Sequence, residues 1–226
     1  MKKNILISII LLLLMNVTLI SDSKGTVALI NKIIRTVEFK TGEEDWHKAT
    51  VGRNLIDNDL VRTGEKSLAI ISFLDGSILR VRENSEVAIY GDKKKRELDK
   101  NVLIDKGVIG FDVKKQENEE FKFTTPTLVA SIRGTSGYIE VGEDGSTLFS
   151  LETGLVNLEA SSGAKQSSEL TPGNTASVNA NGILNIGTTT EQVKNRIENS
   201  KKTKTKKLRI QTEKGVVEIE YYSDEN

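Results

Sequence analysis

Short runs of β-forming residues, separated by turns that contain glycine, repeat along residues 25–187. The turns recur about every 8–12 residues, a spacing typical of a β-sandwich or another two-sheet architecture. The clearest turn is Asp75-Gly76-Ser77, because aspartate and glycine both tolerate the positive φ of a tight hairpin. With 18 glycines and only 2 prolines, the chain is rich in the residue that such turns need. We therefore predict an all-β fold of two packed, largely antiparallel sheets.

A faint internal repeat is also compatible with a solenoid-like form of this fold. Leu103–Ile109 resembles Leu151–Val156, and each pattern indicates a strand, a turn and a second strand. Units of this kind can stack into a solenoid-like body, although two ordinary hairpins would give the same pattern. In the first copy, Asp105-Lys106-Gly107 predicts a turn between two separate strands, Val102–Asp105 and Val108–Val113.

The composition changes after Gly187. Residues 190–200 carry apolar side chains at helical spacing, and Thr190 is a suitable N-cap, so a short helix is expected. Residues 201–209 hold six Lys or Arg, which is typical of a solvated linker, with contact to a polyanion as the alternative. Two alternating runs, 208–212 and 216–222, then predict a hairpin. We interpret residues 188–226 as a short helix, a basic linker and a C-terminal hairpin.

Residues 1–24 have the order of regions that is typical of a secretory signal. Lys2 and Lys3 form a short positive region, and the apolar run Ile5–Ile20 follows. This run is shorter than the ~20 apolar residues of a membrane-spanning helix. Because no A-x-A pattern precedes Lys24, a signal anchor formed by residues 5–20 stays open beside a cleaved signal peptide. Both alternatives predict an exported protein, either free in the periplasm or extracellular space or anchored in the inner membrane.

The balance of charge and the rarity of reactive side chains exclude several classes of function. The 32 basic residues are matched by 32 acidic ones, so no nucleic-acid partner is expected. There is no cysteine, hence no disulfide and no thiolate metal site. The single histidine, His47, falls in a polar stretch that does not suit a catalytic triad. Asp57-Asn58-Asp59 lacks the other ligands of a calcium loop. We predict no catalytic residue, metal or cofactor, and keep a hydrolase with paired carboxylates as a weaker alternative.

One apolar stretch, Thr125–Val141, is interrupted by Arg133-Gly134-Thr135. An arginine is unexpected there, so we expect Arg133 to be buried and to bridge carbonyl or carboxylate groups through its five donors. A ligand contact by Arg133 is the alternative. Gly134 predicts a bulge or a close approach of the backbone. Pro126 predicts a strand start or an edge, because it cannot donate a ladder hydrogen bond.

Taken in order, these motifs resemble the FecR-like domain, an extracytoplasmic module. The resemblance covers Gly25 to Gly187 and rests on the ordered set R-T-G, D-G-S and T-P…R-G-T. The residues that carry it are Arg62, Thr63, Gly64, Asp75, Gly76, Ser77, Thr125, Pro126, Arg133, Gly134 and Thr135. The resemblance implies an all-β domain over residues 25–187. We expect these motif residues to be mainly structural, with binding as a further role.

In FecR-type regulators, a cytoplasmic segment binds a sigma factor, one helix crosses the membrane, and the β-domain senses a receptor. Here only Met1–Asn4 precede the apolar run, so the sigma-binding role is not expected of this sequence. The resemblance leads to the hypothesis of an exported, non-catalytic module that binds or scaffolds an envelope protein or a cell-wall glycan. The alternative is the sensor half of a transmembrane signalling system that works with a separate cytoplasmic partner.

Overall fold

The computed structural model describes residues 25–94, 97–116, 118–161, 163, 165–203, 205–212 and 215–222. The predicted signal peptide or anchor, residues 1–24, lies outside the described residues. The strands of the main body are β1 (Thr26–Ile34), β2 (Val37–Thr41), β3 (His47–Lys48), β4 (Asn54–Ile56), β5 (Asp59–Thr63), β6 (Leu68–Phe73), β7 (Ile78–Val81), β8 (Glu86–Lys94), β9 (Glu97–Asp112), β10 (Phe121–Thr124), β11 (Leu128–Ile132), β12 (Ser136–Val141), β13 (Thr147–Thr153), β14 (Val156–Ala160), β15 (Ser167–Leu170), β16 (Asn174–Val178) and β17 (Leu184–Thr188). Helix α2 (Glu191–Lys201) and the hairpin strands β18 (Thr205–Thr212) and β19 (Gly215–Tyr222) follow.

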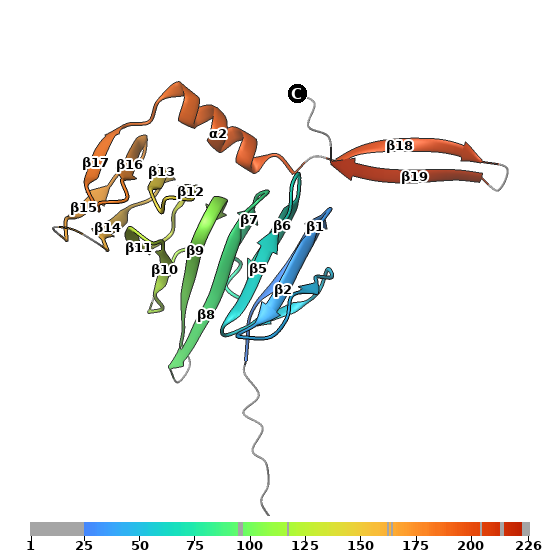
Figure 1. Ribbon diagram of the computed structural model, residues 1–226, viewed down its shortest axis with the longest axis horizontal. Coiled ribbons are helices and arrows are strands. Elements are labelled where there is room, and N and C mark those ends of the chain that lie inside the picture. The colour runs from blue at the N-terminus through green and yellow to red at the C-terminus, as the bar shows by residue number, and fades with distance from the viewer. Residues whose placement is uncertain are drawn as a thin grey trace, which may run out of the picture.

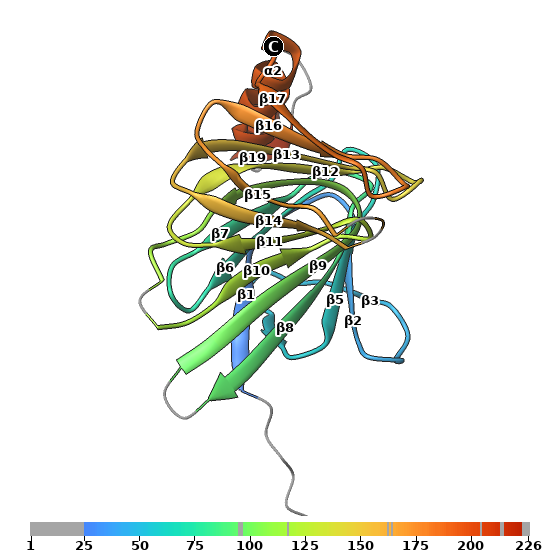
Figure 2. The same cartoon turned by 90° about the vertical axis from the view of Figure 1, so that its left-hand side faces the viewer.

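The strands of the main body form two layers (Figures 1 and 2). Layer A has the strand order β4-β1-β6-β7-β9-β12-β13-β16-β17. Layer B has the order β3-β2-β5-β8-β9-β10-β11-β14-β15. Among these described pairs, β9 and β10 are parallel and the others are antiparallel. The predicted all-β fold of two largely antiparallel sheets is confirmed.

From β10 onward the hairpins alternate between the layers. The β10–β11 hairpin lies in layer B, β12–β13 in layer A, β14–β15 in layer B and β16–β17 in layer A. Each hairpin then pairs with the previous one in its own layer, through β11–β14 and β13–β16. Figure 2 shows the resulting stack. The second half of the body therefore has the solenoid-like stacking that the internal repeat left open.

Strand β9 belongs to both layers and joins them. Its first part pairs with β8 and β10 in layer B, and its last part pairs with β7 and β12 in layer A. The predicted turn at Asp105-Lys106-Gly107 is therefore wrong, because the strand continues through it. Gly107 has φ +98°, and a Cβ atom there would lie 2.5 Å from Ser85 Cα. A glycine thus lets the strand bend from one layer to the other instead of reversing.

The core lies between the two layers. Phe73 of layer A packs edge-on against Phe121 of layer B, with 5.0 Å between ring centroids. At the β9 crossing, the ring of Phe111 lies 4.9 Å from that of Phe123. These four side chains are at most 3% exposed, so they bury large apolar areas and stabilise the contact between the layers.

Helix α2 covers part of the outer face of layer A (Figure 1). Its buried residues Val193 and Ile197 pack on Tyr138 of β12. The predicted N-cap is confirmed, since Thr190 accepts a hydrogen bond from the Val193 amide. Arg196 forms an ion pair with Glu140 at 2.8 Å, beside the Tyr138 contact. The helix is thus fixed to the body through its apolar side and one flanking ion pair.

The predicted C-terminal hairpin is formed by β18 and β19 and points away from the body (Figure 1). The linker before it starts against layer A, where the carbonyl of Lys202 accepts a hydrogen bond from Arg82 at 2.9 Å. No helix in the described part of the chain has the length and the apolar character needed to cross a membrane.

Candidate functional site

The R-T-G motif connects β5 to the turn that follows β7. Thr63 is 6% exposed, and its hydroxyl bonds the carbonyl of Arg82 and accepts from the Ser85 amide at 3.1 Å. The Gly64 amide donates to the carbonyl of Thr36, and its carbonyl accepts from the Asn84 amide. Arg62 lies on the outer face, where its Nε donates to Glu38 at 2.7 Å. In this structure the threonine and glycine of the motif hold strands together.

The D-G-S motif forms the turn between β6 and β7, as predicted. Gly76 has φ +82°, and Asp75 accepts a hydrogen bond from the Ser77 amide at 2.8 Å. The buried Ser77 hydroxyl accepts from the Lys114 amide at 3.0 Å. The motif therefore forms a turn and also binds residues after β9.

The T-P motif precedes β11 and forms a buried cluster of hydroxyl groups. The Thr147 hydroxyl lies 2.7 Å from that of Thr125 and 2.9 Å from that of Thr127. Because β11 is in layer B and β13 in layer A, the cluster joins the two layers. Pro126 is exposed and stands just before β11, which agrees with its predicted place at a strand start.

The R-G-T motif lies between β11 and β12, and here one prediction is wrong. Arg133 is exposed rather than buried, because residues 128, 130 and 132 take the inward positions of β11. Its Nε donates one hydrogen bond, to the carbonyl of Gln116 at 3.1 Å. Gly134 has φ +69° and packs closely on Lys115, as expected. Arg133 is therefore not the buried bridge between carbonyl or carboxylate groups that the sequence predicted.

Gln116 connects two of the motifs. Its side-chain amide donates to Asp75 at 2.9 Å, while its carbonyl accepts from Arg133. Thr135 adds paired backbone hydrogen bonds with Val113. The D-G-S and R-G-T motifs, far apart in the sequence, are thus held against the same short segment after β9.

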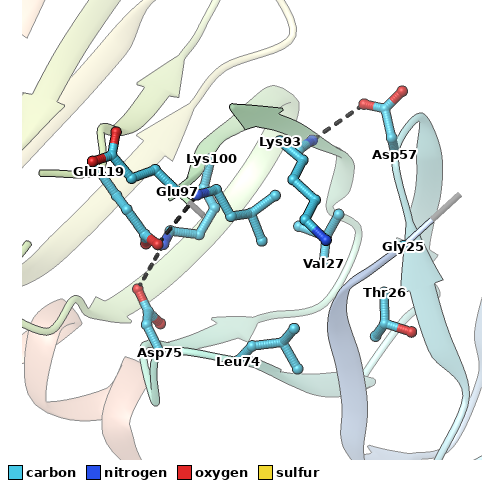
Figure 3. Close-up of a pocket in the computed structure, with 12 residues that line it drawn as sticks. Gly25, Thr26, Val27, Asp57, Leu74, Asp75, Lys93, Glu97, Lys100 and Glu119 are labelled. Atoms are coloured by element: carbon cyan, nitrogen blue, oxygen red, sulfur yellow. Dashed lines mark hydrogen bonds and ion pairs between the residues drawn. The ribbon is translucent and has the colours of Figure 1, made fainter. Parts of the chain in front are cut away.

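A cavity of about 550 Å³ opens beside this network. Its charged lining consists of the carboxylates of Asp57, Asp75, Glu97 and Glu119 and the ammonium groups of Lys93 and Lys100. Leu74, Leu98 and Val27 add apolar walls, and Gly25 stands at the edge. Figure 3 shows these side chains and places Asp75 and Glu119 on either side of Lys100.

Lys100 is the centre of the charged lining. Its side chain is 2% exposed, its ammonium lies 3.1 Å from Asp75, and it also contacts Glu119. Burial raises the pKa of the Asp75 carboxyl, but hydrogen bonds from the Ser77 amide, Gln116 and Lys100 outweigh burial and hold that pKa below its ordinary value. The Asp75 carboxyl therefore stays charged at neutral pH. With four carboxylates and two ammonium groups in its lining, the cavity as a whole is acidic.

Sequence reasoning found Asp75 but missed its partners. Lys100 and Glu119 lie in charged stretches that resemble a solvated surface, and only the pairing of β9 with β10 brings them together. A possible signal was the position of Lys100 in a strand whose alternate residues Val102 and Ile104 are apolar, since all three point to the same side.

The cavity offers charged and apolar contacts. In the ranges that the structure describes, no three acidic or histidine side chains are grouped to hold a metal ion. His47 is exposed on β3, close to the ring of Phe39. The arrangement is suited to binding charged groups.

The comparisons with known proteins agree with the fold. Residues 59–157 match the family model described as FecR protein. This part of the chain resembles the FecR family. The predicted resemblance is confirmed, and the match includes all the motif residues from Arg62 to Thr135, although it is shorter than the predicted 25–187.

The solved structures that resemble this chain are distant from it in sequence. Two crystal structures of a "putative anti-sigma factor from Parabacteroides distasonis ATCC 8503", at 2.50 and 1.65 Å, each have 18% identity and a TM-score of 0.51. Each match covers 59% of this chain and 61% of that protein. At this identity the likeness shows the fold alone. No curated protein matches the chain.

Proposed function

We propose that this protein is a non-catalytic binding module that acts outside the cytoplasm and engages another protein, or a glycan, of the cell envelope. The observation that carries the proposal is the match of residues 59–157 to the FecR family model. Asp75 of the D-G-S motif lines a charged cavity, and Gln116 joins Asp75 to Arg133 of the R-G-T motif. A family of regulatory proteins and a site made of charged and apolar walls both support binding rather than turnover.

The proposed location rests on the N-terminal sequence. Lys2, Lys3 and the apolar run Ile5–Ile20 have the order of an export signal. The described part of the chain begins beside the cavity, which Gly25 and Thr26 line.

Protease protection tests the location. The full chain, carrying a C-terminal tag, is produced in a bacterial host, and spheroplasts are treated with protease. Export predicts that the tag is digested while a cytoplasmic marker survives. A tag that is digested only after cell lysis would place the domain in the cytoplasm and overturn the proposal.

Site-specific crosslinking tests the binding role. A photoreactive amino acid replaces Glu97, which is exposed at the edge of the cavity, or Lys165, which is exposed on the other half of the body. We expect a distinct crosslinked envelope partner from position 97 and none of that size from position 165. Equal crosslinking from both positions would indicate contact without a defined site.

A second candidate is the sensor half of a transmembrane signalling system. It is favoured by the likeness to a structure named as a putative anti-sigma factor. N-terminal sequencing of the purified protein separates the two candidates. A start near Lys24 or Gly25 supports a free exported module, whereas an intact N-terminus supports an anchored sensor.

A further inference from the structure

A second hollow, of about 240 Å³, lies on the outer face of layer B next to Arg133. Its polar lining includes Asn118, Glu119, Lys122, Ser131, Arg133 and Asn157. We call it the Arg133 groove. It shares Glu119 with the acidic cavity, so the two hollows are neighbours on the same region of the surface.

The strand register sets several of these side chains in one row. Lys122 on β10 lies opposite Ser131 on β11, and Ser131 lies opposite Asn157 on β14. Adjacent strands are ~4.8 Å apart, so the row crosses three strands in about 10 Å. Arg133 directly follows β11 and also lines the groove, which places it beside the row.

Among the described residues, the charges of the groove leave one cation without an acidic partner. Glu119 is paired with the buried Lys100, and Glu120 is paired with Lys122 at 2.5 Å. Within the same part of the chain, Arg133 bonds only the neutral carbonyl of Gln116 and forms no ion pair. The lining therefore carries two carboxylates, Glu119 and Glu120, and two cations, Lys122 and Arg133, of which Arg133 is the one outside the described ion pairs.

The hydrogen bond to Gln116 fixes the direction of the guanidinium group. Only Nε is used, so both terminal nitrogens keep their donors in a planar fork. Such a fork matches the two oxygens of a carboxylate. The side chains of Ser131 and Asn157 make no hydrogen bond to any residue that the structure describes, and they are exposed beside it. They can bond the amide groups that flank a carboxylate in a peptide.

We propose that the Arg133 groove binds a carboxylate of a peptide, an Asp or Glu side chain of the protein partner, with Arg133 as its bidentate ligand. This inference rests on the proposed binding function and names the chemistry of the partner. The lining favours a peptide over an acidic sugar, because its one aromatic ring, Phe121, is 1% exposed. Sugar rings in protein sites commonly stack on exposed aromatic faces, and the groove presents none.

Nuclear magnetic resonance titration of the full chain, kept soluble in a neutral detergent, tests this site. The probe is the capped peptide acetyl-Gly-Ser-Glu-Gly-amide, and the matched control carries Gln in place of Glu. We expect saturable shifts of the Arg133 Nε–H and the Asn157 side-chain amide. The Gln peptide should bind about tenfold more weakly, because the charge-assisted fork is lost.

Variants distinguish bidentate binding by the guanidinium group from simple attraction to a positive charge. Arg133→Gln should abolish the saturable shifts, and Arg133→Lys should weaken binding because one ammonium replaces the fork. Asn157→Asp should also weaken binding by placing a competing carboxylate in the groove. Lys48→Gln, which removes an exposed charge on β3 of the same layer, should leave binding unchanged.

Three results would overturn the inference. These are equal binding of the Glu and Gln peptides, unchanged binding in Arg133→Gln, and binding of sodium glucuronate at least as strong as that of the Glu peptide. The last would assign the groove to a sugar acid. If the Glu peptide fails to bind the natural protein, and Arg133→Gln still captures the partner crosslinked from position 97, the proposed function stands and only the groove is wrong.

Discussion

The ammonium of Lys100 lies 3.1 Å from the carboxylate of Asp75, at a place where the lysine side chain is only 2% exposed. Lys100 is on β9 in layer B, and Asp75 is in the turn between β6 and β7 of layer A. The pair therefore ties the D-G-S turn to the opposite layer. Glu119 contacts the same ammonium, so a single buried cation balances two carboxylates.

Replacing Lys100 by methionine should destabilise the protein strongly. The change leaves Asp75 and Glu119 partly buried without their cation, which costs about 3 kcal/mol of unfolding free energy. Lys122→Met is the matched control, because that lysine makes a half-exposed ion pair with Glu120 and should cost at most about 1 kcal/mol. Urea unfolding measures both values. Equal losses of unfolding free energy would show that the burial of Lys100 does not make its ion pairs more important for stability.

The stability of the protein should fall at acid pH through Asp75. The pKa of Asp75 is lowered in the folded protein from 3.8, so the folded state binds fewer protons there than the unfolded state. The stabilisation is present above the unfolded pKa and is lost as the pH falls through the folded pKa. In Asp75→Asn, the decrease in unfolding free energy between about pH 6 and about pH 2 should be smaller.

A control separates this effect from general acid unfolding. Glu43→Gln removes an exposed carboxylate that does not line the cavity and should keep the pH dependence of the natural protein. If Asp75→Asn and Glu43→Gln showed the same pH dependence, Asp75 would not be the group responsible.

Replacing Arg133 by alanine should change stability little. The side chain is exposed and makes one hydrogen bond to a carbonyl, so the expected loss is about 1 kcal/mol or less. The neighbouring change Gly134→Ala should cost more, because φ is +69° and the new Cβ would lie 3.2 Å from Lys115 Cα. Thermal unfolding compares the two. A loss of unfolding free energy above about 2 kcal/mol for Arg133→Ala would support the buried, bridging Arg133 that the sequence predicted.

Gly107→Ala tests the crossing of β9 between the layers. The backbone has φ +98°, and the new Cβ would lie 2.5 Å from Ser85 Cα, so a loss of about 2 kcal/mol or more is expected. Gly187→Ala is the control, because a Cβ at that position would meet no atom within 4 Å and its φ is not positive. A tolerated alanine at 107 in chemical denaturation would mean that the strand can cross without a glycine.

Ile197→Ala should loosen helix α2 without unfolding the sheets. Ile197 is 4% exposed and packs with Val193 on Tyr138, and removing its side chain costs about 2 kcal/mol of local packing. Hydrogen exchange should become at least about tenfold faster for the amides of α2 and stay unchanged for those of β9. Asn195→Ala, on the exposed side of the helix, should not accelerate exchange. Equal acceleration in β9 would show that helix and sheets unfold together.

The class of fold and most of the local structure could be predicted from the residues. The turn at Asp75-Gly76-Ser77 and the N-cap at Thr190 follow from local chemistry, which needs only neighbouring residues. The order of the three motifs was enough to predict the resemblance to the FecR family. These features depend on backbone conformation and short-range hydrogen bonds, so they can be inferred from the residues alone.

Which residues share a site depends on long-range packing, and it became visible in the folded chain. Gly107 predicts a turn locally, but pairing on both sides keeps β9 extended across the two layers. Arg133 interrupts an apolar stretch, yet the phase of β11 turns it outward. Lys100 and Asp75 meet because strands distant in sequence are packed face to face. Contacts of this kind depend on long-range pairing, and a pattern of neighbouring residues does not contain that information.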